Sequence, residues 1–65
     1  MKYSELEKVL KLKTNCRFFK NGSNHPLWIN QDTGEIFAMS HHRNEEVKPG
    51  TLKSIIKKSG VELYF

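Results

Sequence analysis

The 65-residue sequence predicts an α+β fold with the element order α-β-β-β-α, in which a three-stranded antiparallel sheet carries two helices on one face. Two observations lead to this prediction. Segments with helical periodicity stand near both ends of the chain, and three short segments rich in Phe, Trp and Ile lie between them, separated by turn-forming clusters. A chain of this length is expected to form one domain, residues 1–65, that buries only about 60% of the surface its unfolded form exposes.

The first helix is predicted to begin at Ser4. Ser4 and Glu7 have the spacing of a capping box, in which each side chain accepts a hydrogen bond from the backbone N–H of the other residue. Lys8 and Lys11 fall on the solvent-facing side, and the helix is expected to end near Leu12. Its buried stripe consists of the aliphatic residues at helical spacing, Leu6, Val9 and Leu10.

Three strands are expected in the middle of the chain, joined by Asn-Gly-Ser-Asn and Gln-Asp-Thr-Gly. Asn21-Gly22 predicts a type I′ hairpin turn, which needs positive φ at both central residues. Pro26 cannot donate to a sheet ladder, so it belongs at the start of the middle strand, with His25 at the strand's entrance. The predicted strands cover residues 16–20, 26–30 and 35–40.

The middle strand is apolar on both faces, although two helices can cover only one of them. Trp28 is the largest side chain and is therefore assigned to the covered face. Leu27 and Ile29 then lie on the open face together with His25, as an exposed apolar patch of the kind that usually marks a binding partner.

The second helix is predicted from Pro49, which is tolerated in a first helical turn, to Gly60, which ends it. Its apolar stripe is formed by three aliphatic residues, Leu52, Ile55 and Ile56.

Composition narrows the classes of function. Eleven Lys and Arg residues against seven Asp and Glu give a formal net charge of +4, which favours a polyanionic partner. Cys16 is the single cysteine, so no intramolecular disulfide can form, and a buried thiol in a reducing cytoplasm is expected. Because no apolar run approaches the roughly 18 residues of a membrane span and no signal-peptide pattern opens the chain, neither export nor membrane anchoring is expected.

Metal and acyl-transfer chemistry find little support in the spacing of the reactive side chains. The histidines and the cysteine do not show the C-x-x-C or H-E-x-x-H spacing of zinc sites, and His41 and His42 are adjacent, so they point to different sides of an extended segment. Ser23 and His25 lack both the G-x-S-x-G context of a hydrolase nucleophile and a carboxylate placed to orient the imidazole. No metal or cofactor is therefore predicted.

The remaining candidate for chemistry is the strand-entrance residue His25, with lysines and arginines expected nearby in sequence: Arg17, Lys20, Lys48 and Lys53. A histidine can take or give a proton at a ribose 2′-hydroxyl or a leaving oxygen, and cationic side chains can stabilise the negative charge of the phosphorane-like state during RNA cleavage. Taken by spacing alone, an inert surface histidine stays the commoner alternative.

Four segments of the chain together form a specific pattern: Ser4-Glu5-Leu6, Gly22-Ser23-Asn24-His25, His41-His42 and the stretch KPGTLKSIIKKSG at residues 48–60. In the order and spacing of these segments the sequence resembles the HicA toxins of bacterial and phage toxin–antitoxin modules, over nearly its whole length. The C-terminal segment VELYF, residues 61–65, matches nothing in the family pattern.

The resemblance implies a double-stranded-RNA-binding-like fold and an mRNA endoribonuclease whose G-S-x-H histidine, here His25, is essential. It also implies a HicB antitoxin that covers the active site, with Leu27 and Ile29 as expected contacts. We expect RNA phosphates to be held by Arg17, Lys20, Lys48, Lys53 and Lys57. The alternative is a non-catalytic RNA-binding module of the same fold, and DNA binding ranks third because the second helix offers few base-reading side chains.

Overall fold

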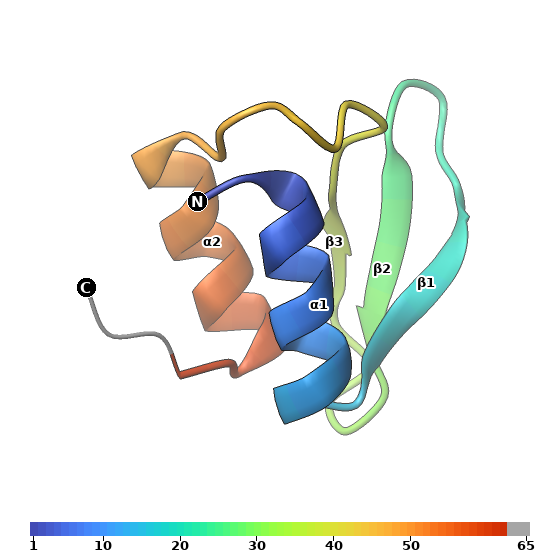
Figure 1. Cartoon of the computed structure of the whole chain (residues 1–65). Coiled ribbons are helices and arrows are strands. Elements are labelled where there is room, and N and C mark those ends of the chain that lie inside the picture. The colour runs from blue at the N-terminus through green and yellow to red at the C-terminus, as the bar shows by residue number, and fades with distance from the viewer. Residues whose placement is uncertain (63–65) are drawn as a thin grey trace.

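A computed structural model of the chain describes residues 1–62, and the predicted order α-β-β-β-α is confirmed (Figure 1). Two helices lie on one face of a three-stranded sheet, so the chain has an α+β fold. Residues 63–65, the end of the C-terminal segment 61–65, lie outside the described part. None of the helices within residues 1–62 is long and apolar enough to cross a membrane. The elements are α1 (Tyr3–Lys13), β1 (Cys16–Asn21), β2 (Pro26–Asn30), β3 (Ile36–Ala38) and α2 (Pro49–Ser59).

The sheet is an antiparallel meander with the strand order β1-β2-β3. α1 lies against β1, and α2 lies against β2 and β3. Phe18 pairs with Trp28 and Lys20 pairs with Leu27, so Phe19 is the extra residue of a β-bulge in β1. The bulge bends β1 shortly before the loop that carries His25.

The first helix begins one residue earlier than the sequence predicts, and the capping box assigned to Ser4 and Glu7 is wrong. Lys2 precedes the helix, and its backbone N–H donates to the Glu5 carboxylate at 3.0 Å. The N–H groups of Tyr3 and Ser4 donate to carbonyl oxygens of the loop before α2, those of Glu45 (3.1 Å) and Arg43 (3.0 Å). Because that loop satisfies the first helical donors, a serine cap is not required.

The type I′ turn predicted at Asn21-Gly22 is also wrong, although the hairpin itself is present. Neither residue has a positive φ, and the connection consists of the four residues 22–25. The Gly22 N–H donates to the His25 carbonyl oxygen at 2.8 Å. A Cβ atom at residue 22 would lie 3.0 Å from that oxygen, so glycine serves here for close approach of two backbone segments.

The faces of β2 agree with the prediction. Trp28 is only 3% exposed on the helix-covered face, whereas Leu27 and Ile29 are half-buried on the open face. The Cys16 thiol is buried, as expected. The core is built from both helices, all three strands and the flanking loops: Tyr3, Leu6, Leu10, Cys16, Trp28, Phe37, Met39, Val47, Leu52, Ile55 and Val61.

The end of α2 is fixed by a buried amide that the sequence analysis did not single out. Gly60 terminates the helix in the left-handed conformation, as predicted, with φ 73°. The side-chain Nδ2 of Asn30 donates to the carbonyl oxygens of Lys58 and Ser59, both at 3.1 Å, and its Oδ1 accepts from the Asp32 N–H at 2.9 Å. Asn30 therefore joins the end of β2 to carbonyls that the helix itself leaves unpaired.

Candidate functional site

His25 is the last residue of the loop between β1 and β2. This loop lies at the top of the sheet in Figure 1. The His25 side chain is exposed and lines a shallow hollow of about 250 Å³, which we call the histidine hollow. Leu27 and Ala38 form the sheet side of this hollow, and the loop residues Gly22, Ser23 and Asn24 form its rim. The hydrogen bond from the Gly22 N–H to the His25 carbonyl oxygen holds the backbone at His25, so the imidazole is attached to a fixed point of the loop.

The imidazole of His25 has no hydrogen-bond or ion-pair partner within residues 1–62. Both ring nitrogens are therefore available to a ligand, and one can accept a proton while the other donates. In the same part of the chain, no three His, Cys, Asp or Glu side chains are grouped as a metal site would require.

The open face of the sheet extends the apolar surface beyond the two residues that the sequence identifies. Ile36 pairs with Ile29 and Ala38 pairs with Leu27, so all four side chains share this face. Ile36 is 42% exposed. The alternation of Ile36 and Ala38 about buried Phe37 is a signal that could have found them in the sequence. We call Leu27, Ile29, Ile36 and Ala38 the open-face patch.

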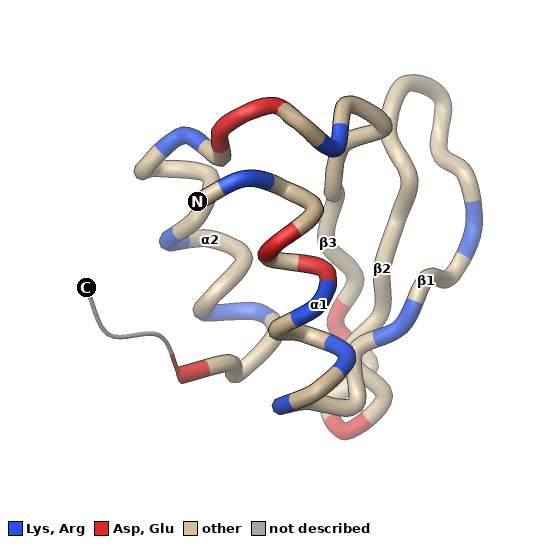
Figure 2. The backbone as a smooth tube through the Cα atoms, viewed as in Figure 1, with Lys and Arg blue, Asp and Glu red and all other residues tan. Residues whose placement is uncertain are grey.

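Of the five predicted RNA-binding residues, Lys20 is the one that the fold brings to the His25 end of the sheet. Lys20 pairs with Leu27, two residues from His25. Arg17 pairs with Ile29 toward the other end, and its guanidinium donates to the carbonyl oxygens of Thr14 (3.1 Å) and Cys16 (2.7 Å). Basic residues occur on α1, α2 and β1 (Figure 2). The predicted residues Lys48, Lys53 and Lys57 belong to α2 or its N-cap, on the helix-covered side.

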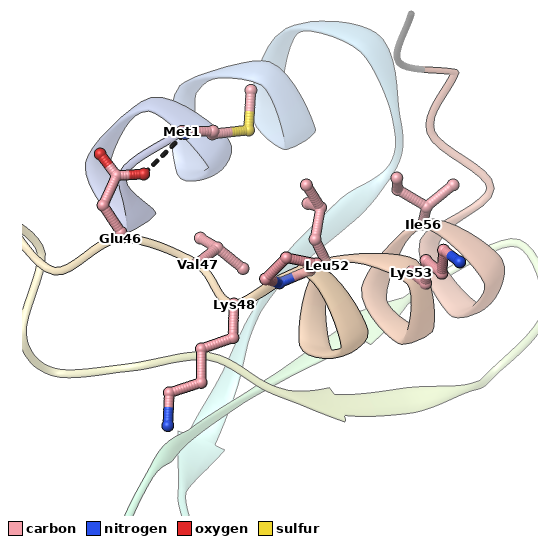
Figure 3. A pocket seen from close by; sticks show the side chains of 8 residues that line it. Met1, Glu46, Val47, Lys48, Leu52, Lys53 and Ile56 are labelled. Atoms are coloured by element: carbon pink, nitrogen blue, oxygen red, sulfur yellow. Dashed lines mark hydrogen bonds and ion pairs between the residues drawn. The ribbon is translucent and has the colours of Figure 1, made fainter. Parts of the chain in front are cut away.

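A larger hollow of about 590 Å³ lies on the helix side of the molecule (Figure 3). Its walls are mainly apolar, and the Lys48 side chain extends away from them. The amino terminus of Met1 donates to the Glu46 carboxylate at 2.8 Å, and this bond raises the pKa of the amino group and lowers the pKa of the Glu46 carboxyl. The hollow contains neither His25 nor a residue of the open-face patch.

The structure thus defines a small basic α+β protein with an exposed histidine at one end of its sheet and an uncovered apolar sheet face beside it. The family model described as HicA toxin of bacterial toxin-antitoxin matches residues 3–61. The chain belongs to the HicA toxin family, and it is therefore the toxin component of a toxin–antitoxin system. No curated protein and no solved structure gives a significant match to this sequence.

Proposed function

We propose that this toxin is an mRNA endoribonuclease that acts in the cytoplasm without a metal or other cofactor, with His25 as its catalytic residue. The supporting observation is the position of His25, an exposed imidazole without a partner within residues 1–62, on a backbone fixed by Gly22 and at the end of the sheet where Lys20 pairs with Leu27. Membership of the HicA toxin family supports a toxic activity for the chain, for which this site is the candidate.

The reaction follows from the chemistry of RNA. His25 takes the proton from a ribose 2′-hydroxyl, whose oxygen forms a bond to the adjacent phosphorus while the bond from phosphorus to the 5′-oxygen breaks. The leaving 5′-oxygen takes a proton from solvent water, His25 later returns its own proton to solvent, and the products carry a 2′,3′-cyclic phosphate and a 5′-hydroxyl. Lys20 carries a positive charge that can stabilise the additional negative charge on the phosphoryl oxygens.

A non-catalytic RNA-binding module remains the second candidate. The observation in its favour is that, within residues 1–62, no carboxylate orients the His25 imidazole. In that case His25 would only donate to or accept from the bound RNA, and no cleavage products would form.

The test is an RNA cleavage assay with His25→Ala and a matched control, His42→Ala. Both side chains are exposed, so both variants should fold normally, as checked by thermal unfolding. We expect His25→Ala to lose cleavage and growth arrest, while His42→Ala retains them. RNA with 2′-O-methyl groups should bind but stay intact, because it lacks the nucleophile. Cleavage by His25→Ala at the wild-type rate would contradict the assignment of His25, and intact RNA with the wild-type protein would favour the binding module.

We further propose that a HicB-type antitoxin neutralises the toxin by docking on the open-face patch and covering His25. Leu27 and Ile29 are half-buried before binding, so complete burial gains less than the full transfer free energy of each side chain. We take about 1 kcal/mol for each, or about 2 kcal/mol together, which corresponds to a change in Kd of roughly thirtyfold.

The antitoxin proposal is tested with the double variant Leu27→Ser/Ile29→Ser. Binding of the co-expressed antitoxin should weaken by roughly thirtyfold, and the fold should persist because Trp28 and the rest of the core are unchanged. Leu12→Ser is the control, since Leu12 is 85% exposed on α1 and lies outside the open-face patch. Equal antitoxin affinities for the double variant and the wild type would rule out docking at these residues.

A further inference from the structure

A second hollow lies at the same end of the sheet as His25, on the helix-covered side. It measures about 210 Å³, which is smaller than the roughly 300–1,000 Å³ of pockets that enclose drug-sized ligands. Three distant parts of the chain meet there: α1, the paired strands β1 and β2, and the loop after β3. Its lining residues are Glu7, Lys11, Phe18, Pro26, Trp28, Ser40, His41 and Arg43. We call it the aromatic hollow.

Two aromatic rings form one wall of the aromatic hollow. Phe18 and Trp28 are cross-strand partners and belong to the same face of the sheet. Trp28 is covered by the core, but Phe18 is 53% exposed although it lies on the face that the helices cover. An exposed aromatic ring in a concave, positively charged setting is the type of platform on which nucleic-acid bases stack.

Cationic groups stand around these rings. The Lys11 Nζ lies 5.9 Å from the centroid of the Trp28 ring. The Arg43 Nε donates to the Glu7 carboxylate at 2.9 Å, which holds the guanidinium in place. The terminal nitrogens of Arg43 have no other partner within residues 1–62, and its side chain remains largely exposed. Such a fixed guanidinium is suited to a phosphate, because its free N–H groups form a planar fork.

The aromatic hollow and the histidine hollow flank the same short stretch of β2 from opposite faces. Pro26 lines the aromatic hollow and directly follows His25, while Leu27 lines the histidine hollow. The Met39 N–H donates to the Pro26 carbonyl oxygen at 2.9 Å, which fixes the segment between Ala38 of one hollow and Ser40 of the other. A single RNA strand that crosses this end of the sheet can therefore contact both hollows.

We propose that the aromatic hollow is a nucleotide subsite for single-stranded RNA. One base stacks against Phe18 above Trp28, and Lys11 and Arg43 bind a backbone phosphate close to the linkage that reacts at His25. This inference rests on the proposed ribonuclease function, and it adds a positioning site that the motif around His25 does not contain.

Trp28 is the only tryptophan of the chain, so its fluorescence reports directly on this hollow. The probe is a short mixed-sequence oligoribonucleotide with 2′-O-methyl groups, which binds without being cleaved. We expect it to quench Trp28 in the wild type. Phe18→Leu should weaken binding by roughly 5- to 150-fold, the loss expected for one base–aromatic stack, and should raise KM for cleavable RNA far more than it lowers kcat.

Leu12→Ala is the control, because Leu12 is 85% exposed on α1 and does not line the aromatic hollow. A second pair tests the charges: Lys11→Gln should make the salt dependence of binding shallower by about 0.7 in log K against log salt, whereas Lys8→Gln, also exposed on α1, should not change it. Equal RNA affinities for Phe18→Leu, Leu12→Ala and the wild type would overturn the subsite.

The outcomes also separate the subsite from the proposed function. If His25→Ala cleaves RNA normally but Phe18→Leu binds it weakly, the subsite is supported and the catalytic assignment is wrong. If His25 is essential and Phe18→Leu binds like the wild type, the catalytic assignment holds and the subsite is overturned. If Phe18→Leu impairs antitoxin binding but not RNA binding, the hollow is a protein interface and the subsite is likewise overturned.

Discussion

Asn30 is expected to contribute more to stability than its small size and polar character suggest. Its amide is 5% exposed and forms three hydrogen bonds, two to the terminal carbonyls of α2 and one to the turn after β2. Asn30→Ala removes all three, and the Ser59 carbonyl oxygen then keeps only the weak hydrogen bond from the Cys16 thiol at 3.5 Å. At about 1 kcal/mol net for each bond, the free energy of unfolding should fall by about 3 kcal/mol.

That loss is large for a protein of this size. A domain of 65 residues is expected to have a free energy of unfolding of roughly 3–10 kcal/mol, so Asn30→Ala should remove a third or more of it. Asn30→Asp keeps the shape but replaces the donor with a negative charge beside the carbonyl end of α2, and it should be more harmful than alanine at neutral pH. The excess should shrink in acid, where protonation removes the charge and restores one donor.

The assay is urea unfolding followed by the fluorescence of Trp28. With a slope near 1 kcal/mol per molar urea, the midpoint for Asn30→Ala should fall by roughly 3 M, or the variant should already be partly unfolded in buffer. Asn15→Ala is the control, because it removes an exposed hydrogen bond of 2.9 Å to Asp32 in the same turn and should cost less than about 0.5 kcal/mol. Equal midpoints for the two variants would refute the assignment of Asn30 as a buried helix anchor.

Three further predictions concern the loop, the pH range and the RNA interaction. Gly22→Ala should impair RNA cleavage more than it impairs folding stability, because the new Cβ would press on the His25 carbonyl oxygen. Gly50→Ala is the control, since its new Cβ meets nothing within 4 Å, and it should be neutral or stabilising in thermal unfolding. Burial, together with the charge of Glu45, raises the pKa of Tyr3 in the folded protein. The resulting stabilisation is fully present below the unfolded-state pKa of about 10, and it is lost as the pH rises through the higher folded-state pKa. Urea unfolding at increasing pH should therefore show a loss in the wild type that is absent from Tyr3→Phe. Cleavage should be insensitive to EDTA, and a loss of activity in EDTA that added metal restores would contradict the metal-free mechanism. RNA binding should weaken as the salt concentration rises, and a flat salt response would contradict the proposed phosphate contacts.

The order of the elements and the faces of the sheet could be predicted from the sequence because each depends on residues that are neighbours along the chain. The alternation in Leu27, Trp28 and Ile29 separates the two faces of β2 whatever surrounds the strand. The limits of α2 follow from Pro49 and Gly60 for the same reason, since each acts through its own backbone torsion angles.

The tertiary structure decided the features that depend on segments far apart in sequence. The first turn of α1 is satisfied by carbonyls of residues 43 and 45, so the local Ser4 cap lost its role. The bulge at Phe19 and the close approach of Gly22 to His25 replaced the expected tight turn.

Contacts between distant segments also decide which charges lie near His25. Strand pairing brings Lys20 to the His25 end of the sheet, whereas the lysines of α2 lie on the helix-covered side. Lys11, Phe18 and Arg43 come together only because a helix, a strand and a loop pack at one corner. A local pattern determines what each segment becomes, but which side chains meet is set by packing between segments, and that information is not contained in any single stretch of the sequence.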